Sequence, residues 1–555
     1  MSRTKFFLYI PILILLSNSV LGADFTTPQI ATPADDGNYA PDDGTIIFSS
    51  NAEDGAAIEN QDGTTIGELN NRLAITVDSN SNGNIKGILN NGTISTGITN
   101  LAAINVTTTG TVDGDGDRSG NAYGIQNRNS LGFLQNFSNI TVTSSGKGTA
   151  RGIDNSNGGS FSTITLFSAG SITVVGAESS GGSLYGTYNA TGIYNHSDLT
   201  NQTIGTITNG SSITATRTGI QNNAEAADAT ITTLTNSGTI KTTGITSVTQ
   251  SGSDFSAAIH NTGTSNGDAL ITTLTNSSTG VIQATANGGY GVLNSTNSTI
   301  STFTNEGSII GGTTSGYGIR TGGVLTTLTN KGTIDGKTHD IQNISALSPT
   351  FTNLVNQQGA DGNDILTFDG TLPTNYKVIV ASTTDYGKVL FSNEAGVTNF
   401  TIDSSSSVSN NTKYAAVVDG IGTSSLGSTR SGSFGEYTWE IVLQSGSSDT
   451  WDLIIGSIRT AYTARITVTS LSNIAEVIEA INTAGSNSTL TSALDGLSDA
   501  SLDKALNQIE GVTIKSVNGQ SFKKHSTFKR AVSSALSGPS VNSLTKNNYA
   551  SLSLN

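Results

Sequence analysis

A short phrase, made of an apolar residue, a variable residue and Asn (Thr321 in one copy) and usually led by Gly, recurs ten times along this chain. Gly219-Ile220-Gln221-Asn222 is a typical copy. The apolar anchors are Ile58, Ile88, Ile125, Ile153, Ile193, Ile220, Ile259, Val292, Ile319 and Ile341. Their spacings are 30, 37, 28, 40, 27, 39, 33, 27 and 22 residues. A period of this size is the signature of a stacked solenoid, so more than half of the chain is one unit repeated.

Each copy contains three short runs in which apolar and polar residues alternate, as half-buried strands require. The phrase itself is the first run, and the other two are I-x-x-L-x-N and G-T-I, as in 231–236 and 238–240. The pattern predicts an all-β fold, a parallel β-helix in which every strand pairs with the coils above and below. A β-propeller is the competing fold, but its blades need about 40 or more residues and a steadier period.

The repeated Asn and Gly suggest two further structural expectations. Asn residues at the same place in consecutive coils can stack, each amide bonding to the next, as in cross-β Asn ladders. The Gly and Asn that follow each run are expected to supply turns with positive φ.

The N-terminus reads as an export signal. Arg3 and Lys5 precede an apolar stretch at 6–16, and small residues then predict cleavage after Gly22 or Ala23. The chain contains no cysteine, which a long solenoid tolerates because neighbouring coils bury one another. Its net charge of −15 argues against nucleic acid as a partner.

After Ile341 the repeat ends and the composition changes, and the predicted domain boundaries follow from that change. Residues 356–456 gain aromatic side chains, including both tryptophans, and read as strands that close the solenoid. Apolar residues at helical spacing then predict helices over 471–481 and 498–511, with Ser498 or Asp499 as the N-cap of the second. The predicted parts are a signal peptide (1–22), a linker or cap (23–44), the repeat β-helix (45–345), a closing segment (346–458), a helical linker (459–515) and a disordered tail (516–555).

The order of these segments resembles the passenger of a Gram-negative autotransporter, the type V secretion family. The stretches at 366–376, 385–387 and 451–453 are similar to the segment that closes such passengers, and 490–511 is similar to the part before the translocating barrel. The resemblance implies a right-handed, pertactin-like β-helix, a cell-surface or extracellular location and an outer-membrane barrel as a partner. Only 40 residues follow Lys515, without alternating strands, so we expect no barrel in this chain. Truncation is the favoured explanation; a split gene or another secretion route stays open.

Candidate ligand-binding residues are few. Asp113, Asp115 and Asp117 alternate beside glycines and could bind Ca²⁺, although Arg118 and Gly124 break the EF-hand pattern and a solvated acidic turn is the favoured reading. The sequence indicates no other cofactor. The four histidines, His196, His260, His339 and His525, are too scattered for a metal set or a catalytic triad, and His260 is expected to be a surface residue. The acidic residues of the repeat are scattered, which argues against an enzyme.

Tyrosines and loops are the remaining candidates for a binding surface. Tyr185, Tyr188, Tyr194, Tyr290 and Tyr317 could line a carbohydrate- or protein-binding stripe, but Tyr123, Tyr290 and Tyr317 directly precede the Gly of the phrase, which favours a structural role in a turn. Loops that project from fixed corners of the solenoid, such as 223–228 and 262–268, are expected to form a recognition surface.

These features predict an exported protein that acts by contact, in adhesion or self-association. Its partners would be surface molecules of host or neighbouring cells, or other copies of itself. A carbohydrate-active β-helix enzyme and a structural surface-layer component are the alternatives.

Overall fold

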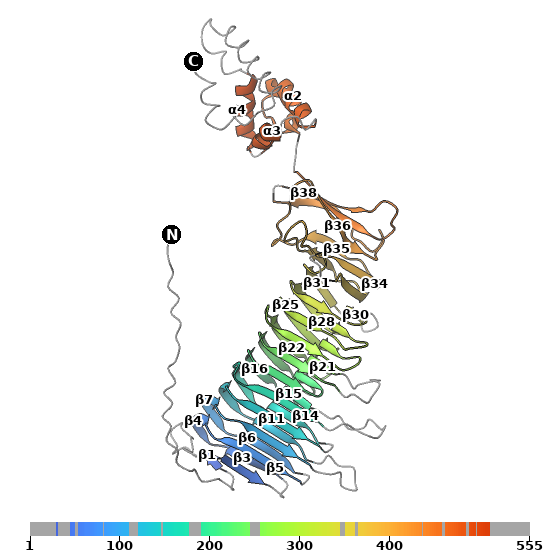
Figure 1. Ribbon diagram of the computed structural model, residues 1–555. Coiled ribbons are helices and arrows are strands. Elements are labelled where there is room, and N and C mark those ends of the chain that lie inside the picture. The colour runs from blue at the N-terminus through green and yellow to red at the C-terminus, as the bar shows by residue number, and fades with distance from the viewer. Residues whose placement is uncertain are drawn as a thin grey trace. The chain divides into compact units, whose positions relative to one another are not determined.

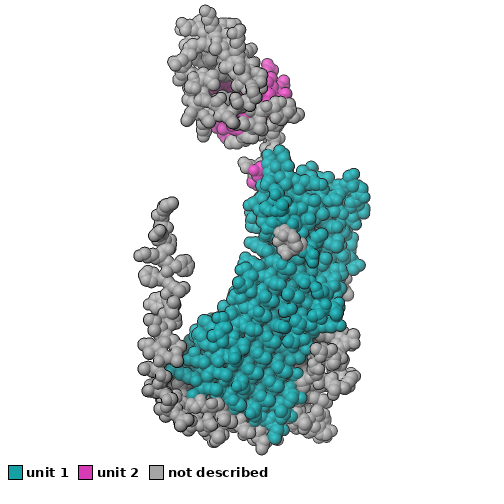
Figure 2. Space-filling model, in the orientation of Figure 1, with its two compact units in different colours: residues 1–434, 439–455 teal, residues 435–438, 456–555 magenta. Residues whose placement is uncertain are grey.

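A computed structural model describes residues 29–31, 45–49, 54–80, 83–109, 120–145, 148–176, 190–244, 256–344, 350–360, 364–435, 437–457, 461–483, 488–495 and 497–510. The signal segment and the tail therefore lie outside the described residues. The chain divides into two compact units, one of residues 1–434 and 439–455 and the other of residues 435–438 and 456–555 (Figure 2).

The first unit is a parallel β-helix of three sheets, in which successive coils stack on one another (Figure 1). We name the sheet that carries the Gly-Ile-x-Asn phrase the anchor sheet; its strands are β1 (Gln29–Ala31), β3 (Asp54–Asn60), β6 (Asn84–Asn90), β9 (Ala122–Asn127), β12 (Ala150–Asn155), β15 (Ala190–Ser197), β18 (Thr218–Ala224), β21 (Ala257–Thr262), β24 (Tyr290–Asn294), β27 (Tyr317–Thr321), β30 (His339–Asn343), β32 (Leu366–Thr371), β34 (Val389–Ala395), β36 (Thr412–Asp419), β37 (Ser431–Phe434), β38 (Tyr437–Leu443) and β39 (Trp451–Ser457).

The I-x-x-L-x-N runs form the threonine sheet, which consists of β4 (Thr65–Asn71), β7 (Thr93–Asn100), β10 (Ser130–Asn136), β13 (Ser160–Leu166), β16 (Gln202–Asn209), β19 (Ala229–Asn236), β22 (Ala269–Asn276), β25 (Ser298–Asn305), β28 (Val324–Asn330), β31 (Thr350–Asn356), β33 (Asn375–Val378) and β35 (Asn399–Ile402). The G-T-I runs form the short-strand sheet, which consists of β2 (Thr45–Ser49), β5 (Ala74–Ser79), β8 (Ile104–Thr108), β11 (Asn139–Ser144), β14 (Ser171–Gly176), β17 (Ser212–Ala215), β20 (Thr239–Thr242), β23 (Val281–Ala284), β26 (Ser308–Ile310) and β29 (Thr333–Asp335). The predicted three strands per coil and the predicted fold class are confirmed.

The anchors of the repeat are in register along the whole solenoid. Ile58 pairs with Ile88, Ile193 with Ile220, and the chain of partners continues to Ile341. The ten anchors are 0 or 1% exposed, so they form one apolar column through the core. Because the partners are 22 to 40 residues apart, insertions are absorbed outside the strands.

The predicted Asn stacking is also confirmed, and it forms ladders in two of the sheets. In the anchor sheet, side-chain amides bond from coil to coil over Asn60, Asn90, Asn127, Asn155, Asn195, Asn222, Asn261 and Asn294, at 2.7–3.0 Å. In the threonine sheet a short ladder joins Asn71, Asn100 and Asn136, and a longer one joins Asn209, Asn236, Asn276, Asn305, Asn330 and Asn356. These Asn residues are buried, so each bond satisfies polar atoms that water does not reach.

The expected positive-φ turns occur after some of the strands, at Asn157 and Gly158 after β12 and at Asn297 after β24. The expectation that the Gly of the phrase itself makes a turn is wrong, because that Gly lies inside a strand. The Gly is needed for close packing instead. A Cβ on Gly192 would lie 2.4 Å from both the Gly219 carbonyl oxygen and Ile213 Cγ2, and other Gly residues of the phrase show the same crowding. The missing side chain lets the anchor strand approach the next coil and the short-strand sheet.

Parallel stacking continues beyond Ile341 with larger side chains. Leu354, Tyr376 and Phe400 are successive register partners in the threonine sheet, and Phe368 pairs with Phe391 in the anchor sheet. The strand order then changes, because β36 pairs with β39 in antiparallel fashion. Trp451 of β39 is 2% exposed and donates its indole N–H to the Ile421 carbonyl oxygen at 2.8 Å. Buried aromatic rings therefore fill the core of the predicted closing segment.

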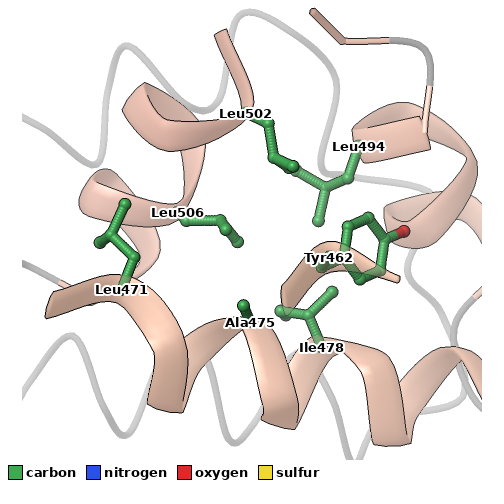
Figure 3. Packing of buried hydrophobic residues seen from close by; sticks show 7 residues of the cluster. All are labelled: Tyr462, Leu471, Ala475, Ile478, Leu494, Leu502 and Leu506. Carbon is green, nitrogen blue, oxygen red and sulfur yellow. The ribbon is translucent and has the colours of Figure 1, made fainter. Parts of the chain in front are cut away.

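The second unit contains α1 (Tyr462–Arg465), the 3-10 turn η3 (Thr469–Leu471), α2 (Ser472–Thr483), α3 (Ser488–Asp495) and α4 (Asp499–Glu510). One apolar cluster holds it together (Figure 3), formed by Tyr462, Leu471, Ala475, Ile478, Leu494, Leu502 and Leu506. The Oγ of Ser498 accepts the Ser501 N–H at 3.3 Å, so Ser498 is the N-cap of α4. The two helices predicted from the spacing are confirmed within a residue or two at each described end.

Candidate functional site on the anchor sheet

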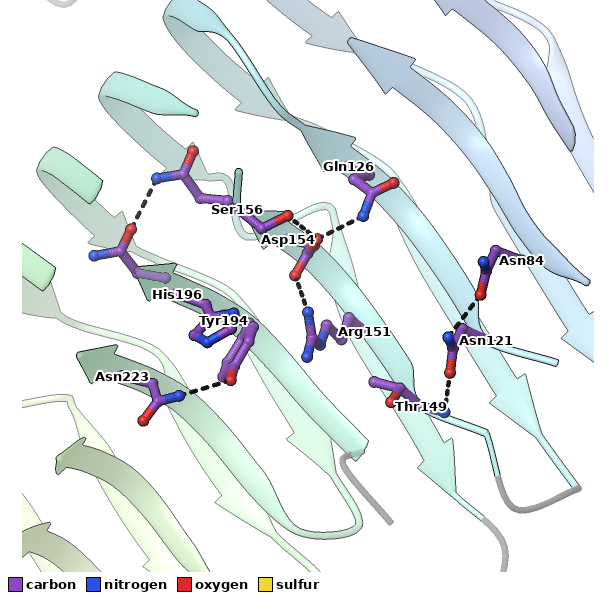
Figure 4. A network of polar contacts seen from close by, with 12 residues as sticks. Asn84, Asn121, Gln126, Thr149, Arg151, Asp154, Ser156, Tyr194, His196 and Asn223 are labelled. Carbon is purple, nitrogen blue, oxygen red and sulfur yellow. Dashed lines mark hydrogen bonds and ion pairs between the residues drawn. The ribbon is translucent and has the colours of Figure 1, made fainter. Parts of the chain in front are cut away.

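The outer face of the anchor sheet carries the most varied side chains of the repeat. Three positions per strand face away from the core: the residue before the Gly, the variable x, and the residue after the Asn. In three neighbouring coils they form a grid of Tyr123, Gln126 and Arg128 in and directly after β9, Arg151, Asp154 and Ser156 in and directly after β12, and Thr191, Tyr194 and His196 in β15. Figure 4 shows six of these residues, Gln126, Arg151, Asp154, Ser156, Tyr194 and His196. The repeat register therefore brings together residues that are about 70 positions apart in the sequence.

An ion pair between Arg151 and Asp154 occupies the centre of this grid. Arg151 Nη1 lies 2.5 Å from Asp154 Oδ1, and the two side chains are 12% and 0% exposed. Asp154 Oδ2 accepts further hydrogen bonds from Gln126 Nε2 and from Ser156 Oγ, both at 2.8 Å. Burial alone would lower the pKa of Arg151, but the Asp154 carboxylate outweighs this and raises that pKa. The Arg151 guanidinium therefore keeps its charge, and the pair is held on several sides.

Two tyrosine rings flank the Arg151 guanidinium. Its Cζ lies 3.8 Å from the ring centroid of Tyr194 and 5.8 Å from that of Tyr123, which is cation–π geometry. Burial raises the pKa of both phenols, and the Arg151 charge opposes that rise. Asn223 Nδ2 donates to the Tyr194 hydroxyl at 2.9 Å.

Part of the hydrogen-bonding capacity of this grid is unused. Arg151 Nε, Gln126 Oε1 and Thr191 Oγ1 are buried and have no hydrogen-bond partner among the described residues. They include a donor and an acceptor, so the grid combines aromatic surface with polar groups of both kinds.

A second cluster lies farther along the same face. The rings of Tyr290, Tyr317 and His339 stack from coil to coil, with centroids 6.1 and 6.4 Å apart. Arg320 Nη1 donates to the Tyr290 hydroxyl at 2.9 Å, and its Nε donates to Gln342 Oε1 at 2.8 Å. Gln342 Nε2 in turn donates to the Tyr317 hydroxyl at 2.9 Å. Tyr317, Arg320, His339 and Gln342 are partly exposed, so this cluster is accessible to solvent.

Between the clusters, His260 occupies the x position of β21. Its Nε2 lies 3.0 Å from Ser295 Oγ. Burial, and to a lesser degree the nearby Arg217 charge, lowers the pKa of His260 to about 3. The imidazole is half-buried, so the expectation of a simple surface residue is only partly right.

The structure leaves several predicted site residues undescribed. Asp113, Asp115, Asp117, Gly22, Ala23, Tyr185, Tyr188 and His525 lie outside the described residues, so the calcium and cleavage predictions stay predictions. Across the part of the chain that is described, no group of three or more His, Asp or Glu side chains could hold a metal ion. The described histidines do not meet, because they lie on β15, β21 and β30.

Other predictions are corrected or refined by the geometry. Tyr123, Tyr290 and Tyr317 lie in strands β9, β24 and β27 and not in turns, because the Gly that follows each of them is itself part of the strand. The loops at 225–228 and 263–268 do lie at one corner, between the anchor and threonine sheets. They contact each other, as Asp268 N donates to Asp228 Oδ1 at 3.0 Å.

Sequence reasoning missed the Arg151–Asp154 pair. The signal was present: when the copies are aligned on their anchors, Gln126, Asp154 and Tyr194 share one column and Tyr123, Arg151 and Thr191 share another. Because the acidic residues were interpreted as scattered, the alignment of Asp154 with Gln126 and Tyr194 was not recognised.

No protein-family model matches the chain, and no curated protein matches it. No helix among the described residues is long and apolar enough to cross a membrane. The class of protein that the fold defines is a parallel β-helix solenoid with a separate small helical unit.

Proposed function

We propose that this chain is the passenger of an autotransporter-like exported protein and that it acts by contact, in adhesion or self-association. The observation that carries the proposal is the outer face of the anchor sheet. There the repeat places arginine, tyrosine, histidine and amide side chains in aligned columns, whereas the strands of the threonine sheet from β13 to β28 hold no charged residue. Tyrosine and arginine are enriched in protein recognition sites because they combine large contact area with directed hydrogen bonds.

The geometry supports binding more than proton transfer. Asp154 is buried, ion-paired and hydrogen-bonded twice more, so its carboxylate is already committed to neighbours. In the second cluster the stacked rings have their faces against one another, which leaves ring edges, hydroxyls and the Arg320 head for a partner. Such a surface suits a polar macromolecule of host or neighbouring cells, or a second copy of this chain.

The binding experiment compares one charge reversal on this face with the same change elsewhere. Arg320→Glu alters the partly exposed second cluster, and Lys241→Glu on the short-strand sheet is the matched control. We expect labelled wild-type protein to bind intact cells saturably or to self-associate in sedimentation, and R320E to lose most of this while K241E keeps it. Equal loss in both variants, or no binding by the wild type, would contradict the proposal. Ordered arrays without cell binding would favour a structural surface-layer component instead.

Export is supported by the N-terminal signal pattern and by the Asn/Gly/Thr-rich β-helix with its aromatic closing segment. N-terminal sequencing of the protein recovered from the surface of producing cells tests it. A mature end directly after Gly22 or Ala23 is expected, and a protein that keeps residues 1–22 inside the cell would refute export.

A further inference from the structure

The threonine sheet presents a regular two-dimensional array on its outer face. Six successive strands each carry a Thr-x-Thr pair whose middle residue points into the core. One column consists of Thr163, Thr206, Thr233, Thr273, Thr302 and Thr327, and the other of Thr165, Thr208, Thr235, Thr275, Thr304 and Thr329. All twelve are partly or fully exposed, so the array faces solvent.

The spacing of the array follows from strand geometry. Neighbours within a column are about 4.8 Å apart, because they lie on adjacent hydrogen-bonded strands. The two columns are roughly 6.6 Å apart, because their members are two residues apart on one strand. Six coils give an array roughly 24 Å long. The register is continuous over these strands, so the spacing is kept from coil to coil.

The hydroxyls of the array make almost no hydrogen bonds to other described residues. Within the described residues, Thr327 alone has a side-chain hydrogen bond, accepting from Asn353 Nδ2 at 3.2 Å. The six strands contain no Asp, Glu, Lys, Arg or His, although the whole chain has a net charge of −15. Their aromatic residues, Phe161 and Phe303, are buried and point inward. The face therefore offers neither charge for an ionic partner nor a ring on which a sugar could stack.

The array is also rigid. β-branched threonines have few rotamers on a strand, so methyl and hydroxyl groups recur in nearly fixed positions. Beneath them, Leu234 and its counterparts are buried, and the Asn236 ladder fixes the ends of five of the six strands, β16 to β28. A rigid, repeating and uncharged surface recognises a ligand that is itself a lattice.

We propose that the threonine sheet binds ice. Oxygen atoms on the prism faces of hexagonal ice recur in two directions at separations close to those of the two columns. Hydroxyls at this spacing can hold water molecules in the positions of the lattice, and the methyl groups between them limit other water arrangements. The binding needs only the described face of six coils and does not rest on the contact function proposed for the anchor sheet.

The test places a bulky side chain in the middle of the array. In the double variant Thr233→Tyr with Thr273→Tyr, the two rings prevent an ice surface from contacting the central coils. The control, Thr173→Tyr with Thr214→Tyr, makes the same change on adjacent strands of the short-strand sheet. Circular dichroism and thermal unfolding check that both double variants keep the wild-type fold. The full-length protein is then assayed for thermal hysteresis and for inhibition of ice recrystallisation, with serum albumin as the baseline.

We expect the wild type and the Thr173/Thr214 variant to show thermal hysteresis, a freezing temperature below the melting temperature of ice. The Thr233/Thr273 variant should show no more hysteresis than serum albumin. A wild type at the baseline would overturn the proposal, as would equal loss in both double variants. Binding of the wild type to crystalline cellulose that is lost in the Thr233/Thr273 variant, without hysteresis, would reassign the face to a polysaccharide and equally overturn it.

Discussion

Replacing one rung of the anchor-sheet Asn ladder should weaken the solenoid locally and by a large amount. Asn222 is fully buried. Its Nδ2 donates to Asn261 Oδ1 at 2.9 Å and to the carbonyl oxygens of Ala229 and Leu270 at 3.0 and 3.2 Å. Its Oδ1 accepts from Asn195 Nδ2 at 2.8 Å. Asn222→Ala removes all four bonds and adds no partner.

The magnitude follows from the polar atoms that lose their partners. Asn195 Nδ2 keeps a bond of 3.2 Å to the Thr230 carbonyl oxygen, whereas Asn261 Oδ1 loses its side-chain donor. A buried polar atom left unsatisfied costs about 1–3 kcal/mol, so the loss of the donor to Asn261 Oδ1 lowers the free energy of unfolding by about 1–3 kcal/mol. Since each coil of a solenoid contacts only its neighbours, the effect should stay near β15, β18 and β21.

The chain contains a natural reference for this substitution. Leu166 stands where an Asn would continue the threonine-sheet ladder, and the ends on either side are satisfied locally. Asn136 Nδ2 donates to the Ser138 carbonyl oxygen at 2.7 Å, and Asn209 Oδ1 accepts from Ser211 N at 3.1 Å. An interruption is tolerated there because neighbouring groups supply partners to both ends, whereas among the described residues Asn261 Oδ1 has no side-chain donor other than Asn222.

Hydrogen–deuterium exchange of the full chain, read peptide by peptide, is the appropriate assay, because a long repeat array need not unfold in two states. Thr235→Ala, a change at a partly exposed position of β19, the next strand along the chain, is the control. We expect N222A to speed exchange in residues 190–262 but not in residues 317–343, and T235A to change neither. A cost below about 1 kcal/mol in N222A, or acceleration spread over the whole solenoid, would refute the reasoning, since one unsatisfied buried atom already costs about that much.

Three further predictions concern the site and the closing segment. Arg151→Met leaves the Asp154 carboxylate buried and unpaired and should lower stability by about 3–5 kcal/mol in denaturant melts; the double change R151M/D154L should recover most of it, and no recovery would contradict the pairing. His260 has a folded pKa of about 3, below its unfolded value of about 6.5, so its contribution to stability is present above pH 6.5 and is lost as the pH falls towards 3. The free energy of unfolding of H260Q should therefore depend less on pH between pH 6.5 and 4 than that of the wild type. An unchanged slope would show that His260 does not cause this pH dependence. Trp451→Phe leaves the Ile421 carbonyl oxygen without its indole donor and should cost about 1–3 kcal/mol, whereas W451A should cost about 3–5 kcal/mol; similar melting temperatures for wild type and W451A would show that this core does not stabilise the solenoid.

The fold followed from sequence because its determinants are local and repeated. Each anchor, such as Ile220, lies in a strand whose alternation of apolar and polar residues can be recognised within a few residues, and the stacking of Asn222 follows from the repeat alone. The helical spacing of apolar residues at 471–481 can be recognised for the same reason. The role of Gly192 was misread because its crowding involves Ile213 and the Gly219 backbone, which neighbouring sequence letters do not reveal.

The candidate site depends on contacts between coils, and those were harder to foresee. Arg151 and Asp154 are three residues apart, but their partners Gln126 and Tyr194 come from other coils, across spacings of 28 and 40 residues. The uneven insertions obscure the columns until the copies are aligned on their anchors. The variable positions of the repeat therefore carry more information about contact chemistry than the invariant ones.

Hydroxyl-radical footprinting of the protein, free and bound to intact cells, tests the central claim that the anchor sheet is the contact surface. Tyr317 and His339 are partly exposed, reactive side chains on that face, and Leu199 and Val397 are exposed side chains away from the second cluster. The account predicts that binding lowers the oxidation of Tyr317 and His339 and leaves that of Leu199 and Val397 unchanged. Unchanged oxidation of Tyr317 and His339 in cell-bound protein would contradict it.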